Sequence, residues 1–456
     1  MNHARTSRKF LKDAERVHWH DRALWFVREK RDLAVDQVPE WESLRDRAVE
    51  IKDHTLANLE HYLNEFKKNA TANGIIVHRA ADAGEHNRIV HEILAARGVT
   101  KLVKSKSMLT EECGLNEFLE QKGIEVIDTD LGERIIQLRN EPPSHIVLPA
   151  IHLKREDVGD LFRERLGTDE GNNDPGYLTA RAREHLRNHF LTAEAGLTGV
   201  NFAVADRGGI VLCTNEGNGD LGATLPPLHI ACMGIEKLVP GMKELAVFIR
   251  MLARSATGQP VTAYTSHYFG PRPGGEMHVV IVDNGRSKIL AHPKYRQSLR
   301  CIRCGACLNT CPVYRRSGGH SYGYPIPGPI GSVLSPHYNL ERHKSLPYAS
   351  TLCGSCSSVC PVRISLHELL LEWRRDVVRA GRLPLIKRMM MFTAGRVLIS
   401  RPIYHIVSFA GRRLLPLVPG FMLKGKWNPW TRGREMPVFP KKRFRDLIKD
   451  RNYEKQ

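Results

Sequence analysis

The sequence contains no long uncharged apolar run. Its most apolar stretch, residues 385–424, is interrupted by Arg396, Arg401 and further arginines, whereas a membrane-spanning helix needs about 18 or more apolar residues in succession. Residues 6–12 faintly resemble a twin-arginine export signal. Charged residues follow them at once, where such a signal needs an apolar stretch of about 7 to 15 residues. We therefore expect a cytoplasmic protein without a transmembrane span.

Acidic residues are scarce relative to basic ones. The chain has 49 Asp and Glu against 68 Lys and Arg, a formal net charge of +19, which favours acidic partners. A nucleic-acid-binding protein would show a basic stripe interleaved with aromatic residues, or a known binding module, and neither is found. Nucleic acid is therefore not an expected partner. The Arg- and Lys-rich segment 374–445 could instead face an acidic protein or, peripherally, an anionic membrane.

Two ligand signatures are also missing. No convincing Gly-x-Gly-x-x-Gly follows a predicted strand, so bound NAD or flavin is not supported. The 21 histidines form no His-x3-His or carboxylate-flanked metal set. His145, His152, His229 and His267 fall near predicted strand ends and could act as a base toward a hydroxyl group. None of the four is favoured over the others.

Short apolar runs alternate with helical stretches from Gly74 onward. The expected strands are 75–77, 101–103, 124–127, 145–148, 201–205, 210–212, 261–265 and 278–282. This alternation predicts an α/β fold with an open, mostly parallel sheet flanked by helices. Before Gly74, apolar residues recur at helical spacing, which predicts a helical arm.

Seven of the ten cysteines fall in two runs with related spacing. The first run consists of Cys301, Cys304, Cys307 and Cys311, followed by Pro312. The second consists of Cys353, Cys356 and Cys360, followed by Pro361, with Ser350 where a first cysteine would stand. The spacing C-x2-C-x2-C-x3-C-P is that of bacterial ferredoxins, in which the fourth cysteine ligates the other cluster. The isolated Cys113, Cys213 and Cys232 are expected to be core residues.

This crossover rule predicts two iron–sulfur clusters, most simply of the 4Fe–4S type. The first would be held by Cys301, Cys304, Cys307 and Cys360, and the second by Cys311, Cys353 and Cys356. The second lacks a fourth cysteine, so Ser350, His343, a solvent oxygen or an external ligand would complete it, or it would be a 3Fe–4S cluster. Structural zinc is the alternative, but zinc sites seldom need two interlocked runs that each end in Cys-Pro.

Several motifs of the α/β half resemble one known family. They are Lys104–Met108, Thr110–Glu112, Asp128–Arg134, Gln137–Leu138, Pro143–Ile146, Pro149–His152, Glu194–Asn201, Ala205–Gly209 and Thr214–Asn218. With the two cysteine runs they are similar to the lactate-utilisation B family, iron–sulfur proteins whose α/β half belongs to the LUD family. The resemblance implies a cytoplasmic system of three proteins that oxidises L-lactate to pyruvate for growth on lactate. Its B protein carries electrons, and its cluster pattern also has seven cysteines.

We therefore expect four parts. They are a helical arm (1–73), a LUD-like α/β domain (74–293), a helical ferredoxin-type two-cluster domain (294–370) and a basic helical tail (371–456). The expected function is an electron-transfer subunit that works with two further lactate-utilisation proteins, while the electron acceptor is not indicated. Two alternatives stay open: this chain is itself the catalytic subunit for lactate or another 2-hydroxy acid, or it is a regulatory iron–sulfur sensor.

Glycine-rich turns at the ends of predicted strands indicate where an organic ligand would bind, because open α/β sheets bind ligands there. The candidate pocket residues are Thr198, Gly199, Asn201, Asp206, Gly208, Gly209, Asn215 and Gly217. Exposed backbone amides at these turns could hold a carboxylate or a phosphate, helped by Arg207 or Lys106. The alternative, favoured for any single turn, is that the glycines only build tight turns.

Overall fold

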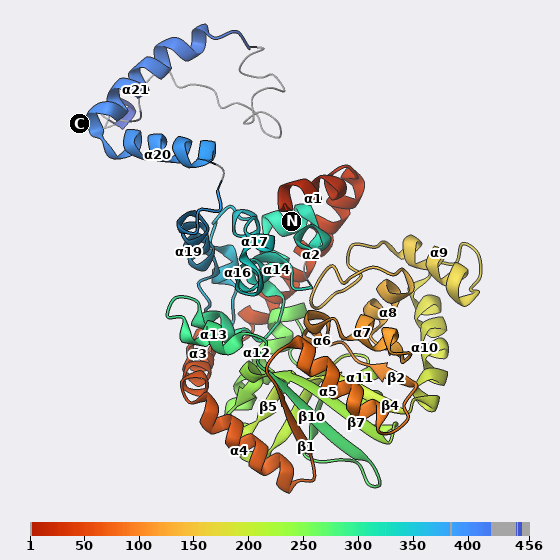
Figure 1. Cartoon of the computed structure of the whole chain (residues 1–456). Helices are drawn as coiled ribbons and strands as arrows, with labels where there is room; N and C mark the ends of the chain where they lie inside the picture. Colours follow the sequence, from red (N-terminus) through yellow and green to blue (C-terminus); the bar gives the residue numbers. More distant parts are fainter. Residues whose placement is uncertain (1, 324, 384, 421–443, 445, 449–456) are drawn as a thin grey trace. The chain divides into compact units, whose positions relative to one another are not determined.

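The computed structural model describes residues 2–323, 325–383, 385–420, 444 and 446–448. Two compact units are present, Met1–Val377 and Val378–Gln456. The first unit contains the arm, the α/β region and both cysteine runs (Figure 1). The four-part division of the chain at residues 73, 293 and 370 stays a prediction.

The amino-terminal arm is helical, as its apolar spacing predicts. Its helices are α1 (His3–Leu11), α2 (Ala14–Asp36), α3 (Trp41–Ala57) and α4 (Leu59–Ala72). The Asp13 side chain caps α2 by accepting the Arg16 N–H at 2.9 Å. After α4 the chain turns at Gly74, whose φ of 83° suits glycine. The arm thus ends where the helical pattern in the sequence ends.

The α/β region is built on a six-stranded sheet in which every strand pairing is parallel, which confirms the predicted fold class. The strand order is β1-β10-β7-β4-β2-β3. The strands are β1 (Ile76–Ala80), β2 (Lys101–Lys104), β3 (Glu125–Asp128), β4 (Ala195–Gly199), β7 (Leu228–Gly234) and β10 (Glu276–Val282). Strand β7 is buried along its whole length, as expected for the centre of a parallel sheet covered on both faces.

Helices cover both faces of this sheet (Figure 1). The helices of the α/β region are α5 (Ala83–Ala95), α6 (Met108–Cys113), α7 (Leu115–Gln121), α8 (Leu131–Leu138), α9 (Arg155–Leu166), α10 (Pro175–Thr192), α11 (Asn218–Thr224), α12 (Met242–Thr257) and α13 (Arg286–Ala291). Alternate residues of β10 join different cores: Val280 packs with residues of α5 and α7. Val279 packs on the other face with Phe66 of α4. The period of two side chains follows from strand geometry.

A second, four-stranded sheet was not foreseen in the sequence. It has the order β8-β5-β6-β9 and contains antiparallel pairs. Its strands are β5 (Phe202–Val204), β6 (Gly209–Thr214), β8 (Leu238–Val239) and β9 (Tyr264–Tyr268). The strand expected at 261–265 thus lies at 264–268. This sheet adds a layer beside α4, in the core that also contains Ile210 and Phe66.

Two central strands, β4 and β7, were not predicted, and for β4 the reason is physical. Strand β4 has the small-residue sequence Ala-Gly-Leu-Thr-Gly, which carries little strand signal. A Cβ on Gly196 would lie 1.7 Å from the Gly222 carbonyl oxygen. Glycine is therefore needed at this position so that α11 can pack directly on the sheet.

One predicted strand is wrong. The strand predicted at 145–148 is absent, because residues 144–147 form a bend. The Nδ1 atom of His145 accepts the backbone N–H groups of Val147 and Leu148, both at 3.0 Å. Because the imidazole binds these two amides, they are not available to a sheet. The bend lies against Gly305 of the first cysteine run.

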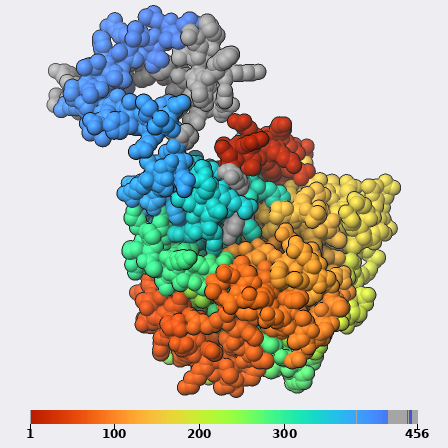
Figure 2. Space-filling view, in the orientation of Figure 1, coloured from red at the N-terminus to blue at the C-terminus, as the bar shows by residue number. Residues whose placement is uncertain are grey.

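The cysteine region is helical, as predicted. Its elements are η3 (Arg296–Arg300), α14 (Ala306–Thr310), α15 (Pro312–Ser317), η4 (Gly319–Tyr322), α16 (Gly328–Tyr338), α17 (Leu340–His343), η5 (Leu346–Tyr348), α18 (Ser355–Ser358) and α19 (Leu366–Arg379). Helix α2 contacts α14 and α15, and α1 contacts η4. Figure 2 accordingly shows the red amino-terminal helices beside the cyan cysteine region. The Trp373 indole N–H donates to the Val333 carbonyl at 2.8 Å and fastens α19 to α16.

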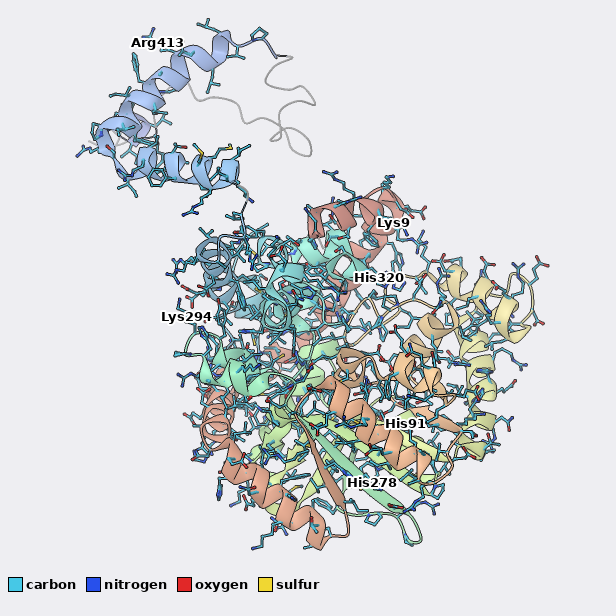
Figure 3. The ribbon with its side chains drawn as sticks, in the orientation of Figure 1. Lys9, His91, His278, Lys294, His320 and Arg413 are labelled. Carbon is cyan, nitrogen blue, oxygen red and sulfur yellow. The ribbon has the colours of Figure 1, made fainter. Side chains whose placement is uncertain are left out.

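The second unit contains α20 (Leu385–Ile399) and α21 (Arg401–Leu414), and neither helix has a buried residue. Both combine exposed apolar side chains with arginines. Arg413, labelled on α21 in Figure 3, is one of them. Its guanidinium carbon lies 5.6 Å from the centre of the Phe409 ring. No helix within the described residues has the length and apolar character to cross a membrane. Residues 421–443 of the predicted basic tail lie outside the described residues.

Candidate metal centre

The structure brings four thiols of the two cysteine runs together around one cavity. Cys301, Cys304 and Cys307 of the first run and Cys360 of the second line it, together with apolar residues such as Ile330. This set of four is the set that the ferredoxin crossover rule predicts for the first cluster. Cysteine thiolates with an apolar surrounding are the donors that iron–sulfur clusters use, so the side chains present fit such a group.

The loops of the two runs have matching backbone conformations. Arg303 has a φ of 61° and Gly305 of 79°, while the equivalent residues Leu352 and Gly354 have 56° and 81°. Positive φ is unusual outside glycine, so its recurrence at the same two positions is a strong local match. A Cβ on Gly305 would also lie 3.1 Å from His145 Cε1.

Ser350 occupies the same local position as the first cysteine of the complete run. The backbone N–H of Arg303 donates to Cys301 Sγ at 3.4 Å. The N–H of Leu352 donates to Ser350 Oγ at 3.1 Å. The serine hydroxyl therefore stands, relative to Cys353, as the Cys301 thiol stands relative to Cys304. His343, the other protein candidate for a fourth ligand, is buried on α17.

The thiols of the second predicted set also influence one another. Burial, together with the neighbouring Cys311 and Cys353, raises the pKa of Cys356 to about 12. Burial likewise raises the pKa of Cys307, with smaller contributions from thiols of both runs, including Cys304 and Cys356. The two sets are therefore adjacent. Iron binding would offset this preference for the neutral thiol, because the thiolate is the metal ligand.

Over the part of the chain that the structure describes, no three His, Cys, Asp or Glu side chains are grouped around a position for a single metal ion. A cluster does not require such convergence, because each thiolate binds its own iron atom. Backbone N–H groups also reach the sulfurs outside the loops: Tyr314 donates to Cys311 Sγ at 3.5 Å and Ile364 to Cys360 Sγ at 3.4 Å. Hydrogen bonds to ligand sulfurs tune cluster potentials.

Arginines of the amino-terminal arm hold the second run, a role that the sequence did not reveal. Arg45 donates to the Cys360 carbonyl at 2.9 Å and to the Ser358 carbonyl at 2.9 Å. Arg31 donates to the Val359 carbonyl at 3.3 Å. Both arginines are buried, although they belong to helices α2 and α3. The sequence did contain a signal for this role, because both arginines lie on the apolar stripe of an amphipathic helix. Charged residues are buried at such positions only when they are paired.

The arginines near the clusters carry less free charge than the sequence implies. Arg300 pairs with Asp53 at 2.6 Å, and Arg315 with Asp21 at 3.2 Å. Arg363 pairs with both Glu42 and Asp46, at 2.8 and 2.7 Å. We expect these arginines to raise the reduction potentials of the clusters, but the paired carboxylates offset much of that field.

A second cavity, of about 300 Å³, lies at the carboxyl ends of β2, β4 and β7. Arg303 and Cys304 of the first cysteine run form part of its wall. Cys304 and Ile146 line both this cavity and the four-thiol cavity. The two cavities therefore share part of their wall, which Cys304 and Ile146 form.

An ion network joins the cavity wall to the cysteine loop. Arg286 binds Glu112 at 2.9 Å and Glu236 at 2.7 Å, and Glu236 lies 3.7 Å from Arg303. Burial alone would raise the pKa of Glu236, but Arg286 and Arg303 outweigh burial and hold that pKa at about 2. Glu236 therefore remains a carboxylate beside the first run.

The predicted pocket residues are not all brought together. The second cavity is lined by three of them, Gly199, Asn201 and Asn215, and also by Lys106. The other five do not line it: Thr198, Asp206, Gly208, Gly209 and Gly217. Gly208 instead packs against the arm, where a Cβ would lie 2.1 Å from the Ala70 nitrogen. Arg207 is exposed. These turns end different strands, and the sequence could not tell which of them face one another.

The four histidines proposed as bases also stand outside the lining of this cavity. His145 lies 2.9 Å from Asn309 Oδ1, and since its Nδ1 is an acceptor, Nε2 is the donor. His152 lies 3.0 Å from Glu141, and His229 lies 2.9 Å from the Thr198 hydroxyl. Burial lowers the pKa of His229 to about 4. In Figure 3, His278 and His91 lie on β10 and α5, in the sheet region rather than in the cysteine region.

Comparisons with known proteins agree with this organisation. Residues 63–290 match a LUD domain, and residues 297–364 match a 4Fe-4S dicluster domain. The chain is 46% identical to "Lactate utilization protein B" of Bacillus cytotoxicus over 433 residues, which cover 91% of this chain and 90% of that protein. It is 44% identical to proteins of the same name from Macrococcus caseolyticus (93% and 92% covered) and Bacillus subtilis (93% and 91%). A crystal structure of a DUF162 family protein from Deinococcus radiodurans covers 49% of this chain and 98% of its own at 15% identity, with a TM-score of 0.29, too low to inform the fold.

Proposed function

We propose, because this chain belongs to the lactate utilization protein B family, that it is the iron–sulfur electron-transfer subunit of a complex that oxidises L-lactate to pyruvate. The observation that carries the proposal is the single cavity lined by Cys301, Cys304 and Cys307 of one run and Cys360 of the other. Thiols contributed by both runs are the arrangement of a two-cluster electron carrier.

Each cysteine has a defined role in this proposal. Cys301, Cys304, Cys307 and Cys360 would hold a 4Fe–4S cluster, and Cys311, Cys353 and Cys356 a second one, for which Ser350 would provide the fourth ligand. When bound, such clusters accept and release single electrons. The protein's own contribution is to bury the thiols, donate N–H groups to their sulfurs, and keep the two sites adjacent so that electrons cross a short distance.

The complex would contain two further lactate-utilisation proteins and work in the cytoplasm. The exposed apolar and basic surface of α20 and α21 supports an interaction role, because apolar side chains that a chain leaves uncovered commonly mark a partner site. Large residues with more than half of their surface exposed occur on both helices, including Ile386 at 74% and Ile406 at 68%.

A second candidate function is that this chain is itself the catalytic subunit. The specific observation in its favour is that Cys304 lines the α/β cavity as well as the four-thiol cavity. A substrate in the α/β cavity would then be next to its electron acceptor. The candidates differ in what the purified chain does alone: an electron carrier has little turnover, whereas a catalytic subunit reduces a dye with lactate.

The decisive experiment is anaerobic reconstitution of the three proteins with L-lactate and an artificial electron acceptor, with one protein omitted at a time. The proposal predicts that activity requires this chain and that this chain alone has almost none. A Cys304→Ser variant should still assemble with its partners but should lose activity. Activity that is unchanged without this chain, or with that variant, would contradict an electron-transfer role.

A further inference from the structure

The second cavity has the position and size of a small-molecule site. It opens where β2, β4 and β7 end, the usual place for a ligand in an open parallel sheet. A volume of about 300 Å³ lies at the lower end of the range of small-molecule sites, which suits a compact ligand. The bend at residues 146–148 and helix α12 form other parts of the wall.

The carboxylates in the cavity wall already have partners. Glu112 and Glu236 bind Arg286, and Asp130 lies 3.4 Å from Lys106. Glu216 accepts the Leu131 N–H at 3.0 Å. Burial and the nearby Asp130 raise the pKa of Glu216. Three of these four carboxylates are therefore paired with a cation, and the fourth accepts a backbone N–H.

Two basic side chains of the wall keep donors that no protein group satisfies. The Nη1 atom of Arg303 is buried without a hydrogen-bond partner. Lys237 lines the cavity, and no described residue lies within hydrogen-bond or ion-pair distance of its ammonium group. Buried donors are normally satisfied, so the Arg303 donor indicates that an acceptor from outside the chain belongs here. The half-buried Lys237 adds a second positive charge to the same wall.

The rest of the wall suits the body of a short acid. Leu148, Leu252 and Ala256 provide apolar surface, while Asn201, Thr257 and Thr262 provide polar atoms that could bind a hydroxyl or carbonyl group. The acid would bind beside Cys304, because Cys304 lines the same space.

We propose that this cavity binds a small 2-hydroxycarboxylate or its 2-oxo product, with the carboxylate held by Arg303 and Lys237 next to Cys304. The identification of the acid as lactate or pyruvate rests on the proposed function. The anion site itself rests on the unsatisfied Arg303 donor and on the position of Lys237 in the same cavity wall. Arg303 belongs both to the cavity wall and to the cysteine loop. A bound carboxylate would therefore change the electrostatic surroundings of the first cluster site directly.

The test uses the full chain, purified without air and with its clusters in place. L-lactate, pyruvate and inorganic phosphate are titrated separately by calorimetry, while EPR records the spectrum of the reduced clusters. We expect both organic acids to bind and to alter the EPR spectrum. Lys237→Gln and Arg303→Gln should each weaken binding of the acids at least tenfold. Lys237→Arg, which keeps the positive charge, should retain most of the wild-type affinity.

The matched control is Arg207→Gln, which removes an exposed cation of the same region that does not line the cavity. This variant should bind both acids as the wild type does. Iron and sulfide contents are measured for every variant, so that loss of a cluster is not mistaken for loss of the ligand site. If Arg303→Gln loses iron, the Lys237→Gln variant decides the result, because Lys237 is remote in sequence from the cysteines.

Three results would overturn the proposal: no binding of either acid, binding unchanged in Lys237→Gln, or phosphate binding as tightly as the organic acids. If the three-protein mixture still oxidised lactate in any of these cases, the electron-transfer function would stand and lactate would bind elsewhere. If instead the chain bound lactate but proved dispensable in the mixture, the proposed function would fail while the anion site remained.

Discussion

In the first cysteine run the Arg303 N–H donates to a thiol, Cys301 Sγ, and in the second the Leu352 N–H donates to a hydroxyl, Ser350 Oγ. The two loops otherwise share their unusual backbone, with positive φ at the same two positions. The same loop geometry can therefore present a sulfur or an oxygen at its first position. Oxygen is a harder donor than sulfur, so the second site is expected to hold its iron less firmly at that corner.

The two runs also differ in what supports them. The first is fastened to the α/β region, through Glu236 to Arg303 and through His145 to Asn309. The second is fastened to the arm, through Arg45 and Arg31 to backbone carbonyls around Cys360. Each cysteine run is thus supported by a different part of the chain. Because Cys360 of the second run belongs to the first ligand set, the arm and the α/β region both support the first cluster site.

The largest expected effect comes from removing a cysteine. Cys304→Ser should lose the first cluster, so that iron and acid-labile sulfide fall by about half, and lactate oxidation in the three-protein mixture should drop at least tenfold. Cys353→Ser should remove the second cluster instead, and EPR should distinguish the two losses. Cys113→Ala is the control, because Cys113 is a buried cysteine outside both runs. A Cys304→Ser protein with full iron content would contradict the ligand assignment.

The next effect concerns the arm. Arg45→Met removes a buried cation that donates to the Cys360 and Ser358 carbonyls. Leaving these carbonyls unsatisfied should cost about 2 to 4 kcal/mol. The measurement is denaturant unfolding under argon, together with the rate of iron loss from the first site, to which Cys360 belongs. Arg47→Met, in the same helix but exposed, should change stability by less than about 0.5 kcal/mol. Equal behaviour of the two variants would refute the supporting role of the arm.

A smaller and more specific effect is expected at Ser350. Ser350→Ala should convert the second site to a 3Fe–4S cluster and leave the first cluster unchanged. EPR of the oxidised protein should show the 3Fe–4S signal, and iron analysis should show one iron lost per chain. Ser350→Cys should keep four irons and slow their loss in air, because the loop already places an atom there to receive the Leu352 N–H. An alanine variant with the wild-type spectrum would exclude Ser350 as a ligand.

The smallest effect is expected outside both runs. Ile406→Asp places a charge on the exposed apolar surface of α21 and should weaken assembly with the partner proteins a few-fold without changing iron content. Ile406→Leu is the conservative control. Sedimentation of the anaerobic mixture measures assembly, and an unchanged complex would show that this surface is not the docking site.

The sequence predicted the elements with strong local signals. The helical arm, the buried strand β10 and the spacing of the seven cysteines could be read directly, because periodicity and ligand spacing are local properties. Strand β4 was missed because its small residues are dictated by the contact of Gly196 with α11. The strand predicted at 145–148 was wrong because His145 binds the amides that a sheet would need.

The candidate site divides in the same way. Cluster ligands follow from spacing, whereas the positions of Arg45 and Lys237 depend on contacts between segments far apart in the chain. Of the predicted turns, only those of Gly199, Asn201 and Asn215 reach the cavity. The backbone conformation that the two loops share could not be predicted either, because it depends on the positive φ angles of Leu352 and Arg303.

The central claim, that two adjacent iron–sulfur clusters are held by thiols exchanged between the two runs, is tested most directly by EPR of the anaerobically purified, reduced full chain. We predict a spectrum of two clusters that interact magnetically, since thiols of both sets lie close enough to influence Cys307. A preparation without acid-labile sulfide, or the spectrum of one isolated cluster, would contradict it.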